Sequence, residues 1–327
     1  MIGIRNTVFT FACAALCASA LPHAARADSY PEKPVRVVLP YPAGGGGDVI
    51  GRPLAQKLSE RFRRQFVIDN RGGASGNIGM EIVATAPPDG YTLLLALAAQ
   101  LAVNQALYSK LPYDAMRDYA PISLLASAPY FLEVHPTVPV TTLAEFIKLA
   151  HAQPGKLVYG SSGNGGGPHL SMELLRSMAK LDLVHVPYKG AGPALPALLA
   201  GEVKVMFASY GISGQHVRAG RLRALAVSST RRATTMPEVP TIAEAGVPGY
   251  DSGVWYAMLA PKGTPPAIIK VLNTEIVSLL KSSDLNKHLA GDGLDTIGST
   301  PEQLSAYMKT ETKKWTEVVK RSGARID

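Results

Sequence analysis

The chain has 327 residues, of which 46% are hydrophobic, and a formal net charge of +8 at pH 7. This length is about twice that of a typical single-core domain, so two lobes are expected. Lysine and arginine are scattered along the chain and form no stripe interleaved with aromatic residues, which argues against nucleic-acid binding. A mildly basic protein attracts anions only weakly through its net charge.

The N-terminal residues predict a secretory signal peptide. Arg5 precedes an apolar run over residues 8–21, and Ala25-Arg26-Ala27 provides the small-x-small pattern that signal peptidase recognises. The run is shorter than the roughly twenty residues that span a bilayer. We therefore expect a signal peptide over residues 1–27, cleavage after Ala27 and an exported, periplasmic product.

Both cysteines, Cys13 and Cys17, fall inside the predicted signal peptide. The mature chain would then have no thiol for catalysis, metal binding or a disulfide, which suits an oxidising compartment. Neither cysteine follows the residues typical of a lipoprotein cleavage site, so we expect a free periplasmic protein.

The first part of the mature chain alternates between short apolar runs and helical patterns. Strands are predicted at residues 35–39, 66–68 and 91–95, and a helix at about 77–85. A four-residue spacing predicts a further helix after the first strand, with an inner face of Ile50, Leu54, Leu58 and Phe62. Short apolar strands separated by helices are typical of a doubly wound α/β sheet.

The same alternation returns in the second half of the chain. Thr142 and Glu145 form a predicted capping box, and Pro168 suits the first position of a helix. Further strands are predicted at residues 157–159, 183–186, 203–207, 222–227 and 254–259. The last helix is expected to begin after Thr300 and to bury Leu304, Met308 and Trp315.

The C-terminal helices need a sheet to pack on, and the first sheet is the natural partner. We therefore expect a discontinuous first lobe over residues 28–127 plus 251–327, and a second lobe over residues 128–250. The chain would cross between the lobes twice, with hinge segments near 122–134 and 225–253.

Each predicted lobe contains a strand, a glycine cluster and a helix in succession, at residues 44–47 and again at 163–167. In a doubly wound sheet such loops lie at the carboxyl ends of strands, where ligands bind. Glycine lets the backbone approach a ligand, and the free N–H groups of a helix's first turn attract anions. Two such loops facing each other across a cleft would bind an acid. The alternative, that both are merely tight turns, stays open.

Nucleotide-binding motifs do not fit the glycine spacing. Val49 and Ile50 occupy the positions where a dinucleotide fingerprint would have its third glycine. Gly46 and Gly51 have the spacing of the phosphate-binding loop of NTPases, but Arg52-Pro53 stand where that loop needs Lys and then Ser or Thr.

Short blocks spread along the mature chain carry a family resemblance. They are residues 40–45 (PYPAGG), 70–74 (NRGGA), 88–93 (PDGYTL), 111–114 (LPYD), 161–165 (SSGNG), 185–190 (HVPYKG), 220–227 (GRLRALAV), 239–241 (VPT), 244–246 (EAG) and 298–302 (GSTPE). With these blocks in this order, the chain resembles the Bug (TctC-like) family, the extracytoplasmic binding components of tripartite tricarboxylate transporters.

The resemblance implies a two-lobed clamp of the periplasmic-binding-protein type, with each lobe a doubly wound sheet flanked by helices. It implies capture of a small carboxylate-bearing ligand between the lobes for delivery to membrane transporter subunits, with no catalysis. The expected ligand-binding residues are Tyr41, Ala43, Gly44, Gly45, Gly46, Gln100, Ser161, Ser162, Gly163, Asn164, Gly165, His169, Ala208 and Ser209.

Three of these residues carry further expectations. Gln100 is expected in the loop after the third strand, and His169 at the start of the helix that follows the glycine cluster at residues 163–167. Family members often have Asp where this chain has Ala208, which makes an amino-acid ligand less expected. Dicarboxylates, tricarboxylates, aromatic acids, amino acids and amides all stay open as ligands.

Two other functions stay open. The same clamp would serve a ligand-sensing partner of a membrane sensor kinase. A serine hydrolase is a remote alternative, because the residues around Ser161 and Ser162 do not form Gly-x-Ser-x-Gly and the sequence nominates no base. The histidines show no metal-ligand spacing. We expect a monomer with no cofactor, metal or nucleic-acid partner.

Overall fold

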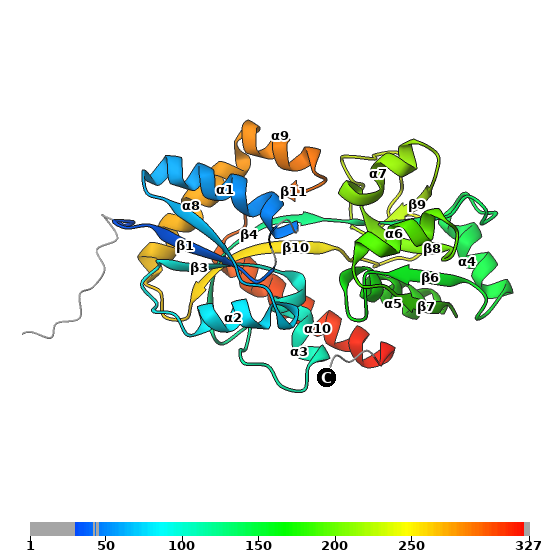
Figure 1. The fold of residues 1–327 in the computed structure, drawn as a ribbon, viewed down its shortest axis with the longest axis horizontal. Coiled ribbons are helices and arrows are strands. Elements are labelled where there is room, and N and C mark those ends of the chain that lie inside the picture. Colours follow the sequence, from blue (N-terminus) through cyan, green and yellow to red (C-terminus); the bar gives the residue numbers. More distant parts are fainter. Residues whose placement is uncertain (1–29, 42, 44–45, 324–327) are drawn as a thin grey trace, which may run out of the picture.

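The computed structural model describes residues 30–41, 43 and 46–323. The predicted signal peptide, both cysteines, Gly44 and Gly45 lie outside these residues. No helix in the described ranges is long and apolar enough to span a bilayer. Figure 1 shows two lobes beside each other, each built on its own sheet with helices around it. The predicted two-lobed α/β fold is therefore confirmed.

The first sheet begins with three parallel strands, as the alternation predicted. They are β1 (Val35–Leu39), β2 (Phe66–Asn70) and β3 (Thr92–Leu97), and β1 lies between the other two. Helices α1 (Gly46–Phe62) and α2 (Asn77–Ala84) follow β1 and β2 along the chain.

Three further strands complete the first sheet, in the overall order β11-β4-β10-β3-β1-β2. Strand β10 (Val254–Pro261) runs antiparallel to both β3 and β4 (Tyr119–Ala128), and the short β11 (Asp295–Thr296) runs antiparallel to β4. Strand β4 was not predicted from the sequence. Its sequence, YAPISLLASA, contains proline and three alanines, which weaken the usual signal of β-branched and aromatic residues.

The second sheet has five strands in the order β7-β6-β8-β5-β9. Strands β6 (Val158–Ser161), β7 (Val184–Pro187) and β8 (Val205–Ser209) are parallel. Strand β5 (Tyr130–Val134), which was not predicted, runs antiparallel to β8 and β9 (Arg223–Val227). Both sheets are therefore mixed, because the strands nearest the interlobe crossings break the parallel pattern.

The two sheets are joined by closely spaced crossings. Pro129 alone separates β4 from β5, and the chain returns to the first sheet between Val227 and Val254. The crossings are hydrogen-bonded to each other, because the N–H of Tyr130 donates to Oγ of Ser228 at 2.8 Å and the N–H of Ser228 donates to the Tyr130 carbonyl at 2.8 Å.

Helices cover both lobes. Those that follow strands of the second lobe along the chain are α4 (Leu143–Ala152), α5 (Gly167–Ala179), α6 (Ala191–Leu199) and α7 (Tyr210–Arg218). The predicted capping box of Thr142 and Glu145 is present at the start of α4. Helices α8 (Pro266–Lys281), α9 (Ser283–Gly291) and α10 (Pro301–Ser322) follow β10 along the chain.

The C-terminal helices enclose the first sheet, because both α8 and α10 contact β4. Successive residues of β1 point to opposite faces: Val37 belongs to a core with Leu272 of α8, and Val38 to a core with Met308 of α10. The predicted inner face of the last helix is confirmed, since Leu304, Met308 and Trp315 are all buried.

Helix α10 also reaches the second lobe. Figure 1 shows its C-terminal half, in red, extending toward α5. Trp315 of α10 and Leu170 of α5 belong to one buried cluster, and Arg321 donates a hydrogen bond to Oγ of Ser177 at 3.2 Å. The lobes therefore meet through side chains as well as through the two crossings.

One buried carboxyl group in the second lobe has no basic partner among the described residues. Glu133 of β5 is 1% exposed; its Oε1 accepts a hydrogen bond from Ser213 at 2.5 Å, and its Oε2 has no hydrogen-bond partner there. Burial raises the pKa of Glu133 to about 8 from an ordinary value of 4.5.

This carboxyl group should make the stability of the protein depend on pH. Below pH 4.5 it is protonated in the folded and unfolded chain alike; between 4.5 and about 8 only the unfolded chain loses the proton. Its contribution to the free energy of unfolding therefore falls by about 1.4 kcal/mol per pH unit across that window. We predict that Glu133→Gln removes this loss of stability. Urea denaturation should then show a higher free energy of unfolding for the variant than for wild type, by a larger margin at pH 8.5 than at pH 5. The exposed Glu238→Gln is the control, and equal pH slopes for Glu133→Gln and wild type would contradict the assignment.

Candidate functional site

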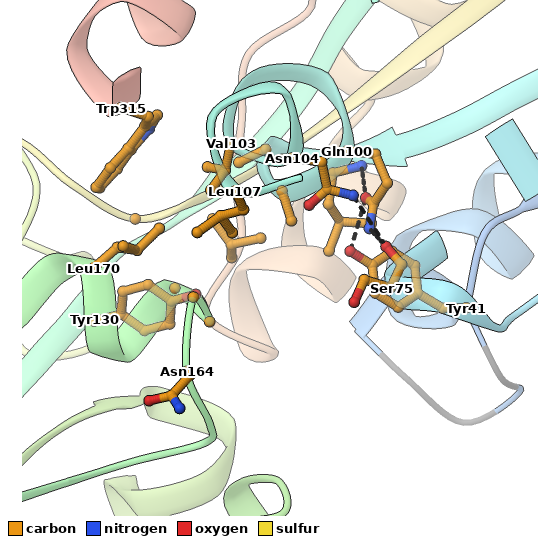
Figure 2. Close-up of a pocket in the computed structure, with 18 residues that line it drawn as sticks. Tyr41, Ser75, Gln100, Val103, Asn104, Leu107, Tyr130, Asn164, Leu170 and Trp315 are labelled. Carbon is orange, nitrogen blue, oxygen red and sulfur yellow. Dashed lines mark hydrogen bonds between the residues drawn. The ribbon is translucent and has the colours of Figure 1, made fainter. Parts of the chain in front are cut away.

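A cavity of about 320 Å³ lies between the two lobes. The first lobe contributes Tyr41, Gln100 and Asn104 to its lining, and the second contributes Tyr130 and Asn164 (Figure 2). This volume is at the small end of the range usual for small-molecule sites, about 300–1,000 Å³. The cavity is therefore of a size that encloses a ligand of few heavy atoms between the lobes.

A second interlobe cavity, of about 640 Å³, adjoins the first, because Leu97, Tyr130 and Val254 line both. Ser209 at the end of β8 and Tyr256 of β10 line it from opposite lobes. The two cavities together form one hollowed region between the lobes.

The first lobe's side of the smaller cavity is held by a hydrogen-bond network. The Tyr41 hydroxyl donates to Oε1 of Gln100 at 2.7 Å, and Nε2 of Gln100 donates to the carbonyl oxygen of Ser75 at 2.8 Å. Asn70, at the end of β2, donates to the carbonyl oxygen of Tyr41 at 3.2 Å. These bonds fix the loop after β1 and the turn before α2 against each other before any ligand arrives.

Gln100 was predicted to lie in a loop, and this prediction is wrong. It lies in a π-helical turn, η3 (Ala99–Val103), which follows β3 and continues as α3 (Asn104–Leu107). Leucine and alanine dominate this segment and favour helix, which explains why the chain becomes helical as soon as β3 ends. Gln100 is 1% exposed, so its amide serves both the network and the cavity wall.

In the second lobe, the glycine loop is held by its own side chains. Ser161 is fully buried, and its Oγ accepts a hydrogen bond from the N–H of Gly163 at 3.2 Å. Nδ1 of His169 accepts from the N–H of Gly165 at 3.0 Å. The expectation that these loop amides are free to bind a ligand is therefore wrong for Gly163 and Gly165, because the side chains of Ser161 and His169 already bind them.

A stack of aromatic rings supports this loop from behind. The ring centroids of His169 and His185 lie 4.1 Å apart, and those of His185 and Tyr159 lie 4.6 Å apart. Burial, together with the neighbouring His169, lowers the pKa of His185 to about 4, and burial also lowers the pKa of His169. Both imidazoles are thus neutral at pH 7, which lets His169 accept from Gly165.

Ser161 also has a potential base that the sequence did not identify, since Nε2 of His185 lies 2.7 Å from its Oγ. A nucleophile has to reach its substrate, however, and Ser161 is fully buried and lines neither cavity. The pair therefore anchors the loop rather than facing a substrate. Ser162, the next residue, lines the larger cavity.

The structure brings half of the predicted site residues to the interlobe cavities. The residues on the smaller cavity are Tyr41, Gln100, Asn164 and Gly165, and those on the larger are Ser162, Ala208 and Ser209. The predicted residues that line neither cavity are Ala43, Ser161, Gly163 and His169. Gly46 begins α1, and Gly44 and Gly45 lie outside the described residues.

Sequence reasoning missed several residues of the smaller cavity. Tyr130 was missed because β5 was not predicted, and Leu170 and Trp315 because they were assigned to helix faces in the core. Ser75 follows the 70–74 block and has a left-handed backbone, with φ of 55°, in the turn before α2. That adjoining block was the one signal for Ser75.

Trp315 is held in the cavity wall by a buried carboxylate. Oε2 of Glu311 accepts from Nε1 of Trp315 at 3.0 Å and from Nε1 of Trp255, on β10, at 3.1 Å. Glu311 is 3% exposed, and its other oxygen forms an ion pair with Lys314 at 2.5 Å. One side chain thus fixes both indoles and joins α10 to the strand that crosses toward the second lobe.

Two lobes, each with a helix-flanked sheet, and a cavity between them define a binding protein of the two-lobed periplasmic type. The family described as the tripartite tricarboxylate transporter family receptor (TctC) matches residues 50–324, and the chain belongs to this family. The predicted resemblance is therefore confirmed.

Several relatives share most of the chain. A Pseudomonas protein encoded in the tcbD-tcbE intergenic region is 39% identical, with 97% of this chain and 94% of the relative covered. The structure of R. palustris Rpa4515 with adipate is 37% identical, with a TM-score of 0.79 over 90% of this chain and 99% of that one. MatC of Rhodopseudomonas palustris with bound malate is 31% identical, with a TM-score of 0.74 over 89% and 100%. Adipate and malate are both small carboxylates.

Among the residues that the structure describes, no group of three or more His, Cys, Asp or Glu side chains is placed to hold a metal ion.

The histidine stack should make stability fall in acid. As the pH drops from 6.5 toward 4, the unfolded chain protonates His185 while the folded chain does not, so the free energy of unfolding decreases. We predict that His185→Gln, which cannot titrate, weakens this decrease, measured as the thermal midpoint between pH 7 and pH 4.5. His288→Gln, at an exposed position, should keep the wild-type slope. A wild-type slope in His185→Gln as well would show that the histidine stack does not contribute to it.

Proposed function

We propose that this protein is a periplasmic receptor that captures a small carboxylate between its lobes and delivers it to the membrane subunits of a tripartite transporter. The observation that carries the proposal is the interlobe cavity of about 320 Å³, to which both lobes contribute polar side chains. Its relatives Rpa4515 and MatC, solved with adipate and malate, support a carboxylate as the ligand.

The cavity would hold an acid with neutral donors. No Lys, Arg, His, Asp or Glu side chain is among its described lining residues, so the carboxylate would be bound by hydroxyl and amide groups. Hydrogen bonds from fixed neutral groups to a charged acceptor are stronger than neutral pairs, about 1.5–3 kcal/mol each. Ser75 is one such donor: its Oγ accepts from the Tyr108 hydroxyl, which leaves the Ser75 proton available.

We propose that the lobes consist of residues 28–127 plus 251–327 and of residues 128–250, and that they move about hinge segments near 122–134 and 225–253. The hydrogen-bonded crossings at Tyr130 and Ser228 support this proposal, because few backbone torsions there would change the angle between the sheets. Closure around the ligand would give the membrane partner a form to recognise that the open protein lacks.

We also propose that residues 1–27 direct export, with cleavage after Ala27, and that the mature protein acts in the periplasm as a binding protein without catalysis. The signal-peptide pattern and the membership in a family of periplasmic receptors support this proposal.

The direct test is a ligand screen of residues 28–327 by thermal shift, followed by calorimetry on each hit. A ligand present at a hundred times its dissociation constant adds about 2.7 kcal/mol of stability, which a thermal shift detects. We expect a small carboxylic acid to bind, and Gln100→Ala to weaken it at least tenfold because the bonds to Tyr41 and Ser75 are lost. The control is Gln56→Ala on the exposed surface of α1. Stabilisation by a sugar or a metal ion but by no acid would contradict the proposal.

A further inference from the structure

The cavity between the lobes has two chemically different ends. Tyr41, Ser75 and Gln100 lie together at one end, whereas Trp315 and Leu170 lie at the other (Figure 2). The hydrogen bonds drawn among the polar side chains all belong to the first end. The ligand therefore meets donors on one side and hydrocarbon on the other.

The apolar end is formed by side chains from both lobes. Val103 and Leu107 come from η3 and α3, Leu170 from α5 and Trp315 from α10. Trp315 has one N–H, and that group already donates to Glu311. The indole consequently offers the cavity an apolar face and no hydrogen bond.

The glycine loop of the second lobe has few backbone amides left for a charged group, so the polar groups this lobe adds are the side chains of Tyr130 and Asn164. The N–H of Gly165 is used by His169, and the N–H of Gly166 donates to the Gly163 carbonyl at 3.2 Å. The first turn of α5 starts at Gly167, but the Tyr130 hydroxyl lies against it so closely that a Cβ built on Gly167 would overlap that oxygen.

These observations decide what the far end of the ligand should be. A carboxylate placed among Leu107, Leu170 and Trp315 would lose its hydration without gaining partners, which costs several kcal/mol. A methyl group or a ring in the same place gains from leaving water. The uncharged side chains of Asn164 and Tyr130 can bind a polar group on the body of the ligand.

We propose that the ligand is a monocarboxylic acid with an apolar body, aliphatic or aromatic, whose carboxylate meets the Ser75 and Gln100 end and whose body lies against Trp315. This inference rests on the receptor function proposed above and narrows its ligand class. The proposed ligand differs from adipate, the molecule in one solved relative, because adipate has a carboxylate at both ends.

Calorimetry with two matched pairs of acids tests the proposal on residues 28–327. Adipate and hexanoate differ only in that a methyl group replaces one carboxylate, and terephthalate and benzoate differ only in the second carboxylate. We expect the monocarboxylate of at least one pair to bind ten times more tightly than its dicarboxylate. Along the series from butanoate to hexanoate, each added methylene should tighten binding about fourfold.

The Trp315→Ala variant tests the apolar wall, because it should weaken binding of the monocarboxylate at least tenfold. Lys313→Ala, an exposed neighbour on the same helix, should bind as wild type does. Circular dichroism and the thermal midpoint report whether Trp315→Ala folds, and Leu107→Ala is the second variant if it does not.

The outcomes separate the two proposals. Dicarboxylates that bind more tightly than their monocarboxylate partners, or a Trp315→Ala variant that folds and binds hexanoate or benzoate as wild type does, overturn the ligand class and leave the receptor function intact. Failure of every acid to bind overturns the receptor function itself.

Discussion

On the proposed function, the site would bind an anion without a single charged side chain in the described lining of the smaller cavity. Neutral donors succeed at this only when they are oriented beforehand, since otherwise ordering them would offset the gain from the hydrogen bonds. The first lobe meets the requirement with the bonds among Tyr41, Gln100 and Ser75. In the second lobe, neutral His169 and buried Ser161 bind loop amides, so they fix the shape of the loop and do not leave these amides to the ligand. Much of the polar structure around the cavity follows from this constraint.

Helix α10 connects this site to the rest of the fold. Its residues pack on the first sheet, contact α5 of the second lobe and place Trp315 in the cavity wall. Glu311 holds Trp315 and also Trp255 of β10, close to the point where the chain crosses between lobes. A ligand against Trp315 thus touches an element whose neighbours include both lobes and a crossing strand. This arrangement offers a physical route by which occupancy of the cavity would affect the angle between the lobes.

The sequence predicted the elements whose local signals agree with their tertiary roles. Strands β1 and β3, the capping box at Thr142 and the buried face of α10 all carry unambiguous periodicity or caps. Strands β4 and β5 were not predicted, because proline and alanine weaken the strand pattern of β4 and no strong turn signal separates it from β5. The site was predicted in part for a similar reason. Glycine loops are visible in a sequence, whereas Tyr130 and Trp315 reach the cavity only through the packing of distant segments.

If the ligand binds in the cavity bordered by Trp315, tryptophan fluorescence should report its arrival. The chain has two tryptophans, and Trp255→Phe leaves Trp315 as the only reporter. Titration of this variant with an acid that binds by calorimetry should change the Trp315 emission saturably, with the same dissociation constant. Binding detected by calorimetry with unchanged Trp315 emission would place the ligand outside this cavity.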